Sequence, residues 1–139
     1  MIRIHFTRKE NLHELAKRLL SDEPGQPVNV SLSYSGKKGV VAISENPVGV
    51  GLKYVKDRNY PSVLSRFSAR EKAEITSREE FIKHWTAKEA FIKMQGYALV
   101  SALKFTEYFG GRIYFKDEKQ PCEITHYKLG KTGILTICK

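Results

Sequence analysis

The stretch HWTAKEAFIKMQG, in the second half of the chain, limits the possible folds more than any other segment. Phe81, Trp85 and Ile92 fall on one narrow stripe at the period of an α-helix. Lys88 and Glu89 flank this stripe, so an ammonium and a carboxylate border the most apolar face of the predicted helix. A fold for this sequence must therefore supply partners for charges at the edge of its core.

Both ends of this helix are marked in the sequence. Ser77 followed by Glu80 forms a capping box, and Gly96 suits the position just after a helix ends. We therefore predict a helix over residues 78–95, the longest in the fold, with its apolar stripe mostly buried.

Shorter segments complete an α+β pattern. Two further capping boxes, Thr7 with Glu10 and Ser68 with Glu71, predict short helices, and another is predicted over 59–67. Alternating or β-branched segments predict strands at 1–6, 28–34, 39–44, 48–55, 104–109, 111–116, 122–129 and 133–138. The expected architecture is a mainly antiparallel sheet packed against one long helix, forming a single domain over residues 1–139 without repeats or a linker.

Composition restricts the partners. The chain has 24 Lys and Arg residues against 15 Asp and Glu, a net charge of +9, which favours an anionic ligand. We rank nucleic acid last, since no basic-aromatic module is present. Cys122 and Cys138 are too few for a disulfide scaffold, and no secretory segment or apolar run of the ~20 residues needed for a membrane span occurs. We expect a cytoplasmic protein with free thiols.

Glu89 and Lys93 are four residues apart on the predicted helix, which leaves two interpretations. A generic pair at this spacing is a surface ion pair worth about 0.3 kcal/mol. Here Trp85 and Ile92 lie on either side of Glu89 along the helix, so the carboxylate borders buried surface and needs a cation, a metal or hydrogen-bond donors. The functional interpretation is a hard-metal or phosphate site at the mouth of the core.

Other local patterns carry little chemical information. The four histidines have no metal-ligand spacing. Gly49 and Gly51 form a glycine pair within a predicted strand, which indicates a tight bend or a close approach of another backbone.

Four segments together resemble the 4′-phosphopantetheinyl transferases. FIKHWTAKEAFIKMQGYAL resembles the family signature W-[ST]-x-K-E-[AS]-x-x-K-x-x-G-x-[GA]-L. VSLSYSG is similar to the N-[IL]-S-H-S-G strand of the family, PVGVGLKYV to its P-[IV]-G-[IV]-D-[IV]-E strand, and SRFSAREKAEI to its R-F-F-S-x-x-E helix. The order and spacing are those of the surfactin-type enzymes, and the resemblance covers roughly residues 28–138. The matched signature positions are Trp85, Thr86, Lys88, Glu89, Ala90, Lys93, Gly96 and Leu99.

The resemblance implies a specific reaction. Such enzymes transfer the phosphopantetheine arm of coenzyme A to a serine of an acyl or peptidyl carrier protein, with magnesium bound to the pyrophosphate and to acidic side chains. It makes Glu89 a catalytic residue, as metal ligand or serine-activating base, and Lys93 a catalytic phosphate-binding residue. The residues expected to bind coenzyme A are Lys88, Lys93, Lys53, Ser33 and Tyr34.

The departures from the family pattern are concentrated in the metal-binding strand. The family's Asp falls on Gly51 and its Glu on Lys53, so two of three metal-binding carboxylates are missing. Tyr34 stands in place of a His, and Ser31 in place of an Asn. Loss of two hard ligands should weaken magnesium binding severely.

The surfactin-type enzymes also consist of two similar lobes, and this chain resembles the second. We therefore expect a homo-oligomer or a partner lobe, because the apolar face toward the other lobe would otherwise be exposed. Three functions remain: an active or weakly active transferase, an impaired homologue that binds coenzyme A or a carrier protein without transfer, and, ranked last, a nucleic-acid binder.

Lys53 is either a product of drift or a cation that replaces the metal at the pyrophosphate. In the second case coenzyme A affinity does not change with EDTA, and Gly51→Asp combined with Lys53→Glu restores magnesium dependence.

Overall fold

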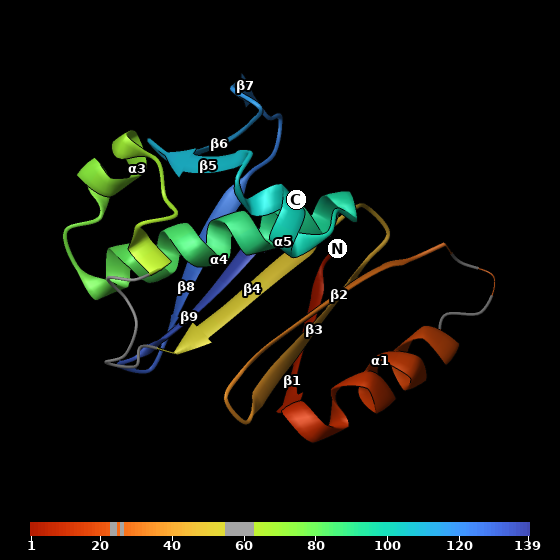
Figure 1. The fold of residues 1–139 in the computed structure, drawn as a ribbon. Helices are drawn as coiled ribbons and strands as arrows, with labels where there is room; N and C mark the ends of the chain where they lie inside the picture. Colours follow the sequence, from red (N-terminus) through yellow and green to blue (C-terminus); the bar gives the residue numbers. More distant parts are fainter. Residues whose placement is uncertain (23–24, 26, 55–62) are drawn as a thin grey trace.

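The computed structural model describes residues 1–22, 25, 27–54 and 63–139, whose strands form three antiparallel sheets (Figure 1). Sheet A has the strand order β1 (Arg3–Arg8), β3 (Lys38–Ser44) and β2 (Asn29–Ser35). Sheet B has the order β4 (Gly49–Tyr54), β9 (Gly133–Cys138) and β8 (Ile124–Leu129). Sheet C has the order β5 (Thr106–Phe109), β6 (Arg112–Phe115) and β7 (Glu118–Lys119). The fold is α+β with antiparallel pairing, as predicted.

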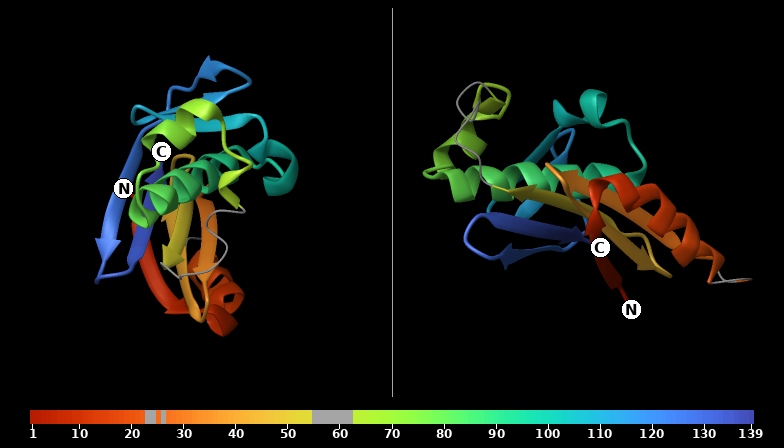
Figure 2. Two further views of the ribbon diagram at one scale, coloured as in Figure 1. Left: turned by 60° about the vertical axis from the view of Figure 1, so that its left-hand side comes forward. Right: turned by 90° about the horizontal axis from the view of Figure 1, so that it is seen from below.

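The helices lie around these sheets. They are η1 (Lys9–Asn11), α1 (Leu12–Ser21), α3 (Ala69–Glu74), α4 (Arg78–Gln95) and α5 (Leu99–Leu103). Helix α1 covers sheet A through Leu12 and Ala16, and α4 packs on sheet B. Helices α1 and α3 lie at opposite ends of the molecule (Figure 2). Within the described ranges, no helix combines the length and apolar character required to cross a membrane.

Helix α4 confirms the central prediction, being the longest helix in the described part of the chain. The Ser77 hydroxyl accepts a hydrogen bond from the Glu80 N–H at 3.2 Å, and Gly96 ends the helix at a φ of 73°. Phe81 and Ile92 are buried, whereas Trp85 is half-buried and stacks on Phe67 and Phe81.

Four local points need comment. Thr7 does not cap a helix: it pairs with Gly39 in the β1–β3 ladder, and no side chain caps η1, because strand pairing takes precedence over the capping box. Helix α5 was not predicted, since five residues are too few to show a helical period. The predicted helix over 59–67 begins, and the predicted strand over 48–55 ends, outside the described residues.

Strands β2 and β4 belong to different sheets but run side by side in the same direction. Three serine hydroxyls on alternate residues of β2 accept hydrogen bonds from backbone N–H groups of alternate residues of β4, at 2.9–3.1 Å. The pairs are Ser31 with Val50, Ser33 with Leu52, and Ser35 with Tyr54. The N–H groups of β4 on this side thus donate to serine hydroxyls of β2, whereas within a sheet they would donate to the backbone carbonyls of a neighbouring strand. This serine junction joins sheets A and B beside α4.

Two glycines let α4 approach the backbone of β4. A Cβ atom at Gly49 would overlap the Ala90 carbonyl oxygen, and one at Gly51 would lie 2.6 Å from the Thr86 carbonyl oxygen. No side chain fits between strand and helix at these positions. The close backbone approach inferred from the glycine pair is therefore confirmed.

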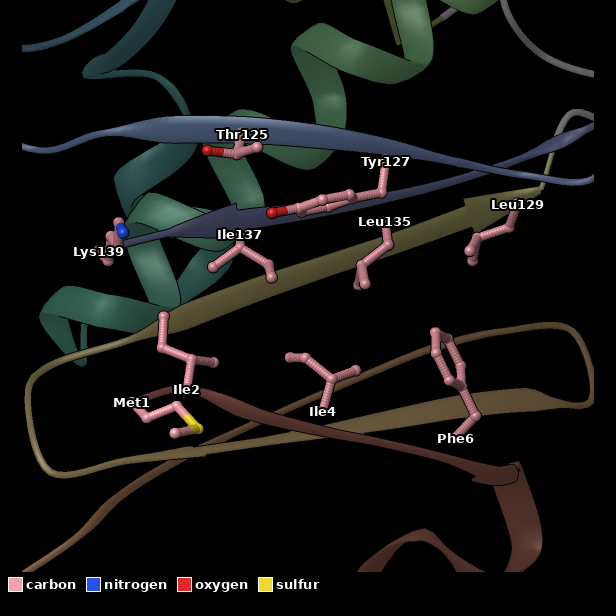
Figure 3. A pocket seen from close by; sticks show the side chains of 10 residues that line it. All are labelled: Met1, Ile2, Ile4, Phe6, Thr125, Tyr127, Leu129, Leu135, Ile137 and Lys139. Atoms are coloured by element: carbon pink, nitrogen blue, oxygen red, sulfur yellow. The ribbon is translucent and has the colours of Figure 1, made fainter.

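An apolar cavity of about 610 Å³ opens between sheets A and B, on the side of sheet B away from α4. The side chains of Ile2, Ile4 and Phe6 point from the β1 segment toward Leu135 and Ile137 (Figure 3). Its lining contains none of the residues predicted to bind coenzyme A or a metal. The cavity is therefore separate from the predicted site.

A chain of polar side chains crosses the interior from β5 to α4. Tyr108 donates its O–H to His126 Nε2 at 3.0 Å, and His126 Nδ1 lies 2.7 Å from the Thr136 hydroxyl. Thr136 lies 2.6 Å from the Thr86 hydroxyl, which donates to the Ile82 carbonyl at 2.8 Å. The Ile82 carbonyl can only accept, so Thr86 donates to it and accepts from Thr136, and Thr136 in turn accepts from His126 Nδ1. All these hydrogen bonds are satisfied when His126 is neutral and carries its proton on Nδ1. Burial of the His126 ring lowers its pKa to about 4.

This shift predicts acid sensitivity. Between pH 6.5 and about 4 the unfolded chain binds a proton at His126 that the folded chain does not, so stability falls as pH falls through this window. The loss reaches about 3 kcal/mol at the acid end. His126→Gln, which cannot titrate, should show a correspondingly shallower pH dependence in urea unfolding between pH 7 and pH 4. Equal slopes for the wild type and the variant would contradict this assignment.

Candidate functional site

Ser33, Glu89 and Lys93 form a hydrogen-bonded cluster between β2 and α4. The Ser33 hydroxyl donates to Glu89 Oε1 at 2.7 Å, and Lys93 Nζ donates to the same oxygen at 3.1 Å. Lys93 Nζ also donates to the Leu32 carbonyl at 2.6 Å. The fold therefore brings together three of the residues that the sequence nominated, from segments more than fifty positions apart.

The serine junction explains the direction of the Ser33 hydrogen bond. Because Ser33 Oγ accepts from the Leu52 N–H at 2.9 Å, its own proton is free to point at Glu89. Two hydrogen bonds therefore connect the Glu89 carboxylate to Leu52, the strand residue next to Gly51.

The two charged side chains of the cluster differ in their exposure to solvent. The Glu89 side chain is 13% exposed and the Lys93 side chain 30% exposed. Lys93 Nζ donates to the Leu32 carbonyl as well as to Glu89, and Glu89 Oε1 accepts two hydrogen bonds from within the protein. The cluster thus keeps its carboxylate largely internal.

Lys88 lies elsewhere, fully buried against Glu71. Its Nζ donates to Glu71 Oε1 at 3.2 Å and lies 4.1 Å from the centre of the Phe67 ring. Burial lowers the pKa of Lys88, and the neighbouring Glu71 carboxylate opposes that shift. Glu71 Oε2 accepts the Tyr108 N–H at 3.1 Å, so the pair ties α3, α4 and sheet C together. For Lys88 to contact a ligand, this pair would have to open.

Tyr34 and Lys53 are both exposed. Tyr34 follows Ser33 and, by strand alternation, faces the other side of β2, where Lys9 Nζ lies 4.2 Å from its ring centre. Lys53 is on the same face of β4 as Gly51, one alternation further along. Lys9 thus supplies a positive charge beside the tyrosine that replaces the histidine of the family pattern.

The residues at this site do not fit a magnesium ion. Gly51 has no room for a carboxylate, because even a Cβ atom would lie 2.6 Å from the Thr86 carbonyl oxygen. The remaining carboxylate, Glu89, is paired with Lys93 and Ser33. In the described ranges no three His, Cys, Asp or Glu residues are arranged to bind a metal.

This geometry corrects one expectation. Gly51→Asp with Lys53→Glu cannot simply restore a metal site, since the aspartate would first have to displace α4 from β4. The substitution should lower stability instead.

Sequence reasoning missed two parts of this arrangement. The Leu32 carbonyl, which accepts a hydrogen bond from Lys93 Nζ, belongs to an apolar residue whose backbone carries no signal in sequence. Glu71 was recognised as a capping residue, and it does cap α3, but its pairing with Lys88 was not foreseen. The spacing of seventeen residues between Glu71 and Lys88 spans a loop and a helix, so no helical or strand period relates them.

Comparison with known proteins agrees with the resemblance. Residues 47–138 match the 4′-phosphopantetheinyl transferase superfamily. The chain is 30% identical over 119 residues to the 4′-phosphopantetheinyl transferase psf-1 of Bacillus pumilus, covering 78% of this chain and 51% of that protein. It is 21% identical over 156 positions to the 4′-phosphopantetheinyl transferase Sfp of Bacillus subtilis (strain 168), covering 99% of this chain and 70% of that one. The chain thus spans about half the length of the first relative.

The cluster predicts unequal effects for two similar substitutions. Ser31→Ala and Ser33→Ala each leave one β4 N–H without its acceptor, but only Ser33→Ala also removes a donor to Glu89. We expect Ser33→Ala to lower the free energy of unfolding by roughly 1 kcal/mol more than Ser31→Ala. Urea unfolding of both variants at neutral pH measures this difference. Equal losses would show that the Glu89 contact contributes nothing.

Proposed function

Because this chain belongs to the 4′-phosphopantetheinyl transferase superfamily, we propose that it binds coenzyme A through lysine side chains without magnesium-dependent transfer. Coenzyme A is the substrate of the family, and its pyrophosphate and 3′-phosphate are the anions that a chain of net charge +9 would attract. A cytoplasmic location belongs to the same proposal.

One observation carries the proposal: the Glu89 carboxylate is neutralised by Lys93 within the protein. In a metal-dependent site this carboxylate would face a cation shared with the pyrophosphate. Here Gly51 and Lys53 replace the other two metal-binding carboxylates of the family, the Asp and Glu of the strand, and α4 fills the space beside Gly51. The positive charge that a pyrophosphate requires would therefore come from lysines outside this pair, such as Lys53, rather than from a metal.

Further cations lie at the turn between β2 and β3. Arg8, Lys9 and Lys37 line a hollow of about 600 Å³, and Lys9 contacts Tyr34, one of the residues expected to bind coenzyme A. Compact ammonium groups bind phosphates as point charges and require no fixed geometry. This supports binding of the coenzyme A phosphates along the edge from the β2–β3 turn to Lys93.

An active transferase is the second candidate, favoured by the presence of both Glu89 and Lys93 at their signature positions. In that case a carrier-protein serine would approach Glu89 as its base. The geometry favours binding over this reaction, because Oε1 of Glu89 already accepts two hydrogen bonds. Under both functions, a carrier protein belongs to the proposal as a partner.

A second protein chain is also part of the proposal, either another copy or a partner lobe. The cavity between sheets A and B supports this, because Phe6 and Tyr127 in its lining remain about half exposed. An apolar surface of this kind is commonly covered in an assembly.

Calorimetric titration with coenzyme A tests the proposal. We expect binding of equal affinity in EDTA and in millimolar magnesium, weakening as salt screens the phosphates. Lys53→Ala should reduce the affinity by about tenfold, the effect of losing one charged hydrogen bond. Lys119→Ala, which removes an exposed lysine from β7 in sheet C, is the matched control and should leave the affinity unchanged.

Two results would reject the proposal. The first is absence of coenzyme A binding by the wild type. The second is a magnesium-dependent mass gain of one phosphopantetheine on an apo carrier protein, read by intact mass spectrometry, which would establish the transferase instead. If the wild type binds coenzyme A and Lys53→Ala binds it equally tightly, Lys53 is a product of drift and does not contact the pyrophosphate.

A further inference from the structure

The six strands of sheets A and B form one curved layer with two ends. The serine junction joins β2 to β4, so the strand order runs β1-β3-β2-β4-β9-β8. Strands β1 and β8 are therefore the end strands of this layer. Residues of both strands line the apolar cavity (Figure 3), so the cavity lies between the two ends.

The other strand edges in the described ranges are protected from pairing with a second molecule. On β5, the N–H of Tyr108 donates to Glu71 Oε2 at 3.1 Å, and in the following turn the Gly110 N–H donates to Glu74 Oε2 at 2.7 Å. Carboxylates of α3 thus occupy donors on the edge of sheet C. Strand β7 has only two residues, both charged, and β8 carries Lys128. Short edge strands and edge lysines are devices that prevent pairing between molecules.

Strand β1 has an edge without such protection. It pairs with β3 on one side, and no strand in the part of the chain that the structure describes pairs with its other side. Its arginines stand only at its two ends, and the four residues between them include no proline, lysine or carboxylate. Ile4 and Phe6 point into the cavity, and Phe6 remains 54% exposed. An open edge with apolar side chains is a template for pairing with another strand.

We propose that β1 pairs antiparallel with β1 of a second copy of this chain, forming a two-fold symmetric dimer in which each copy covers the cavity of the other. The inference rests on the second chain of the proposed function and identifies that chain as another copy. Two-fold pairing of identical strands is closed, because neither β1 keeps an edge for a third chain. The open backbone groups of β1 gain hydrogen-bond partners in the same step.

The residues of β1 select one register. Centring the pairing on His5 sets Ile4 opposite Phe6 of the second copy, and this apolar pair occurs twice. A two-fold axis perpendicular to the sheet keeps each side chain on its own face, so both pairs lie on the cavity side. Centring the pairing half a residue later would set Arg3 opposite Arg8, and like charges directly opposite each other destabilise a strand pair. Strand β1 is thus complementary to itself in the register centred on His5.

Charge gives this dimer a distinct salt dependence. Each copy carries a net charge of +9, so two copies repel each other, and backbone pairing and apolar contact hold the dimer. Added salt screens the repulsion, so dimerisation strengthens as salt rises, whereas coenzyme A binding weakens. The cavity lining contains none of the residues predicted to bind coenzyme A. The dimer can therefore fail while coenzyme A still binds, and the reverse also holds.

Analytical ultracentrifugation of the full chain at tens of micromolar, in low and in high salt, tests the dimer without coenzyme A. We expect the mass of two chains, with tighter association in high salt. Phe6→Lys should weaken dimerisation about a hundredfold, because it buries an unpaired ammonium against apolar side chains. Val100→Lys is the matched control: Val100 lies on α5, is 87% exposed and does not line the cavity, so its variant should dimerise as the wild type does.

A cysteine introduced on the two-fold axis tests the register. The thiol of His5→Cys would lie opposite its own counterpart, and directly opposite residues of antiparallel strands are close enough for a disulfide. Mild oxidation should therefore link two copies of this variant, read by non-reducing gel electrophoresis. Thr7→Cys, whose thiol would lie opposite Arg3, should link far less. Cys122 and Cys138 are free thiols, as predicted, so the oxidised wild type supplies the background.

Circular dichroism first establishes that each variant is folded, and the cysteine comparison decides if Phe6→Lys does not fold. The proposal is overturned if the wild type has the mass of one chain in high salt, or if a folded Phe6→Lys dimerises as tightly as the wild type. It is equally overturned if His5→Cys does not link above the background, or if Thr7→Cys links as readily. Either result would place the second copy on another surface or in another register.

Discussion

The close packing of α4 on the backbone of β4 is the constraint on which the rest of the structure depends. Glycine at positions 49 and 51 brings the helix carbonyls of Ala90 and Thr86 against the strand. This approach places Glu89 at the serine junction, where one hydroxyl can bond both a strand N–H and the carboxylate. The same approach removes the space in which a second carboxylate would stand. Packing and chemistry at this site are therefore decided by the same two residues.

Electrostatics in the interior follow one rule: charged groups on α4 are neutralised by other side chains of the fold. Lys88 pairs with Glu71, and Glu89 pairs with Lys93. Burying an unpaired charge would cost several kcal/mol, whereas a paired and hydrogen-bonded charge is tolerated. The charges that looked anomalous beside an apolar stripe thus have partners: Lys88 pairs with Glu71 on α3, and Glu89 pairs with Lys93 on the same helix and with Ser33 on β2. The remaining excess of positive charge lies on the surface, where it is available to an anionic ligand.

Much of the fold could be predicted because its signals are local. The period of Phe81 and Ile92, the cap at Ser77 and the terminal Gly96 defined α4 within the sequence itself. The family resemblance nominated Ser33, Glu89 and Lys93 from two separate segments, and the fold brings them into contact. Contacts between distant elements could not be predicted in the same way. The Leu32 carbonyl, the Glu71–Lys88 pair and the strand role of Thr7 each depend on which backbone lies nearby, and only the folded chain determines that.

The central claim is that Lys93, and not a metal ion, neutralises Glu89. A double-mutant cycle with Glu89→Gln, Lys93→Met and the combined variant tests it most directly, with unfolding free energies measured both in EDTA and in millimolar magnesium. The account predicts a favourable coupling of about 1–3 kcal/mol between the two side chains, equal in both solutions. A coupling near zero in EDTA, together with magnesium stabilising the wild type but not Glu89→Gln, would contradict it.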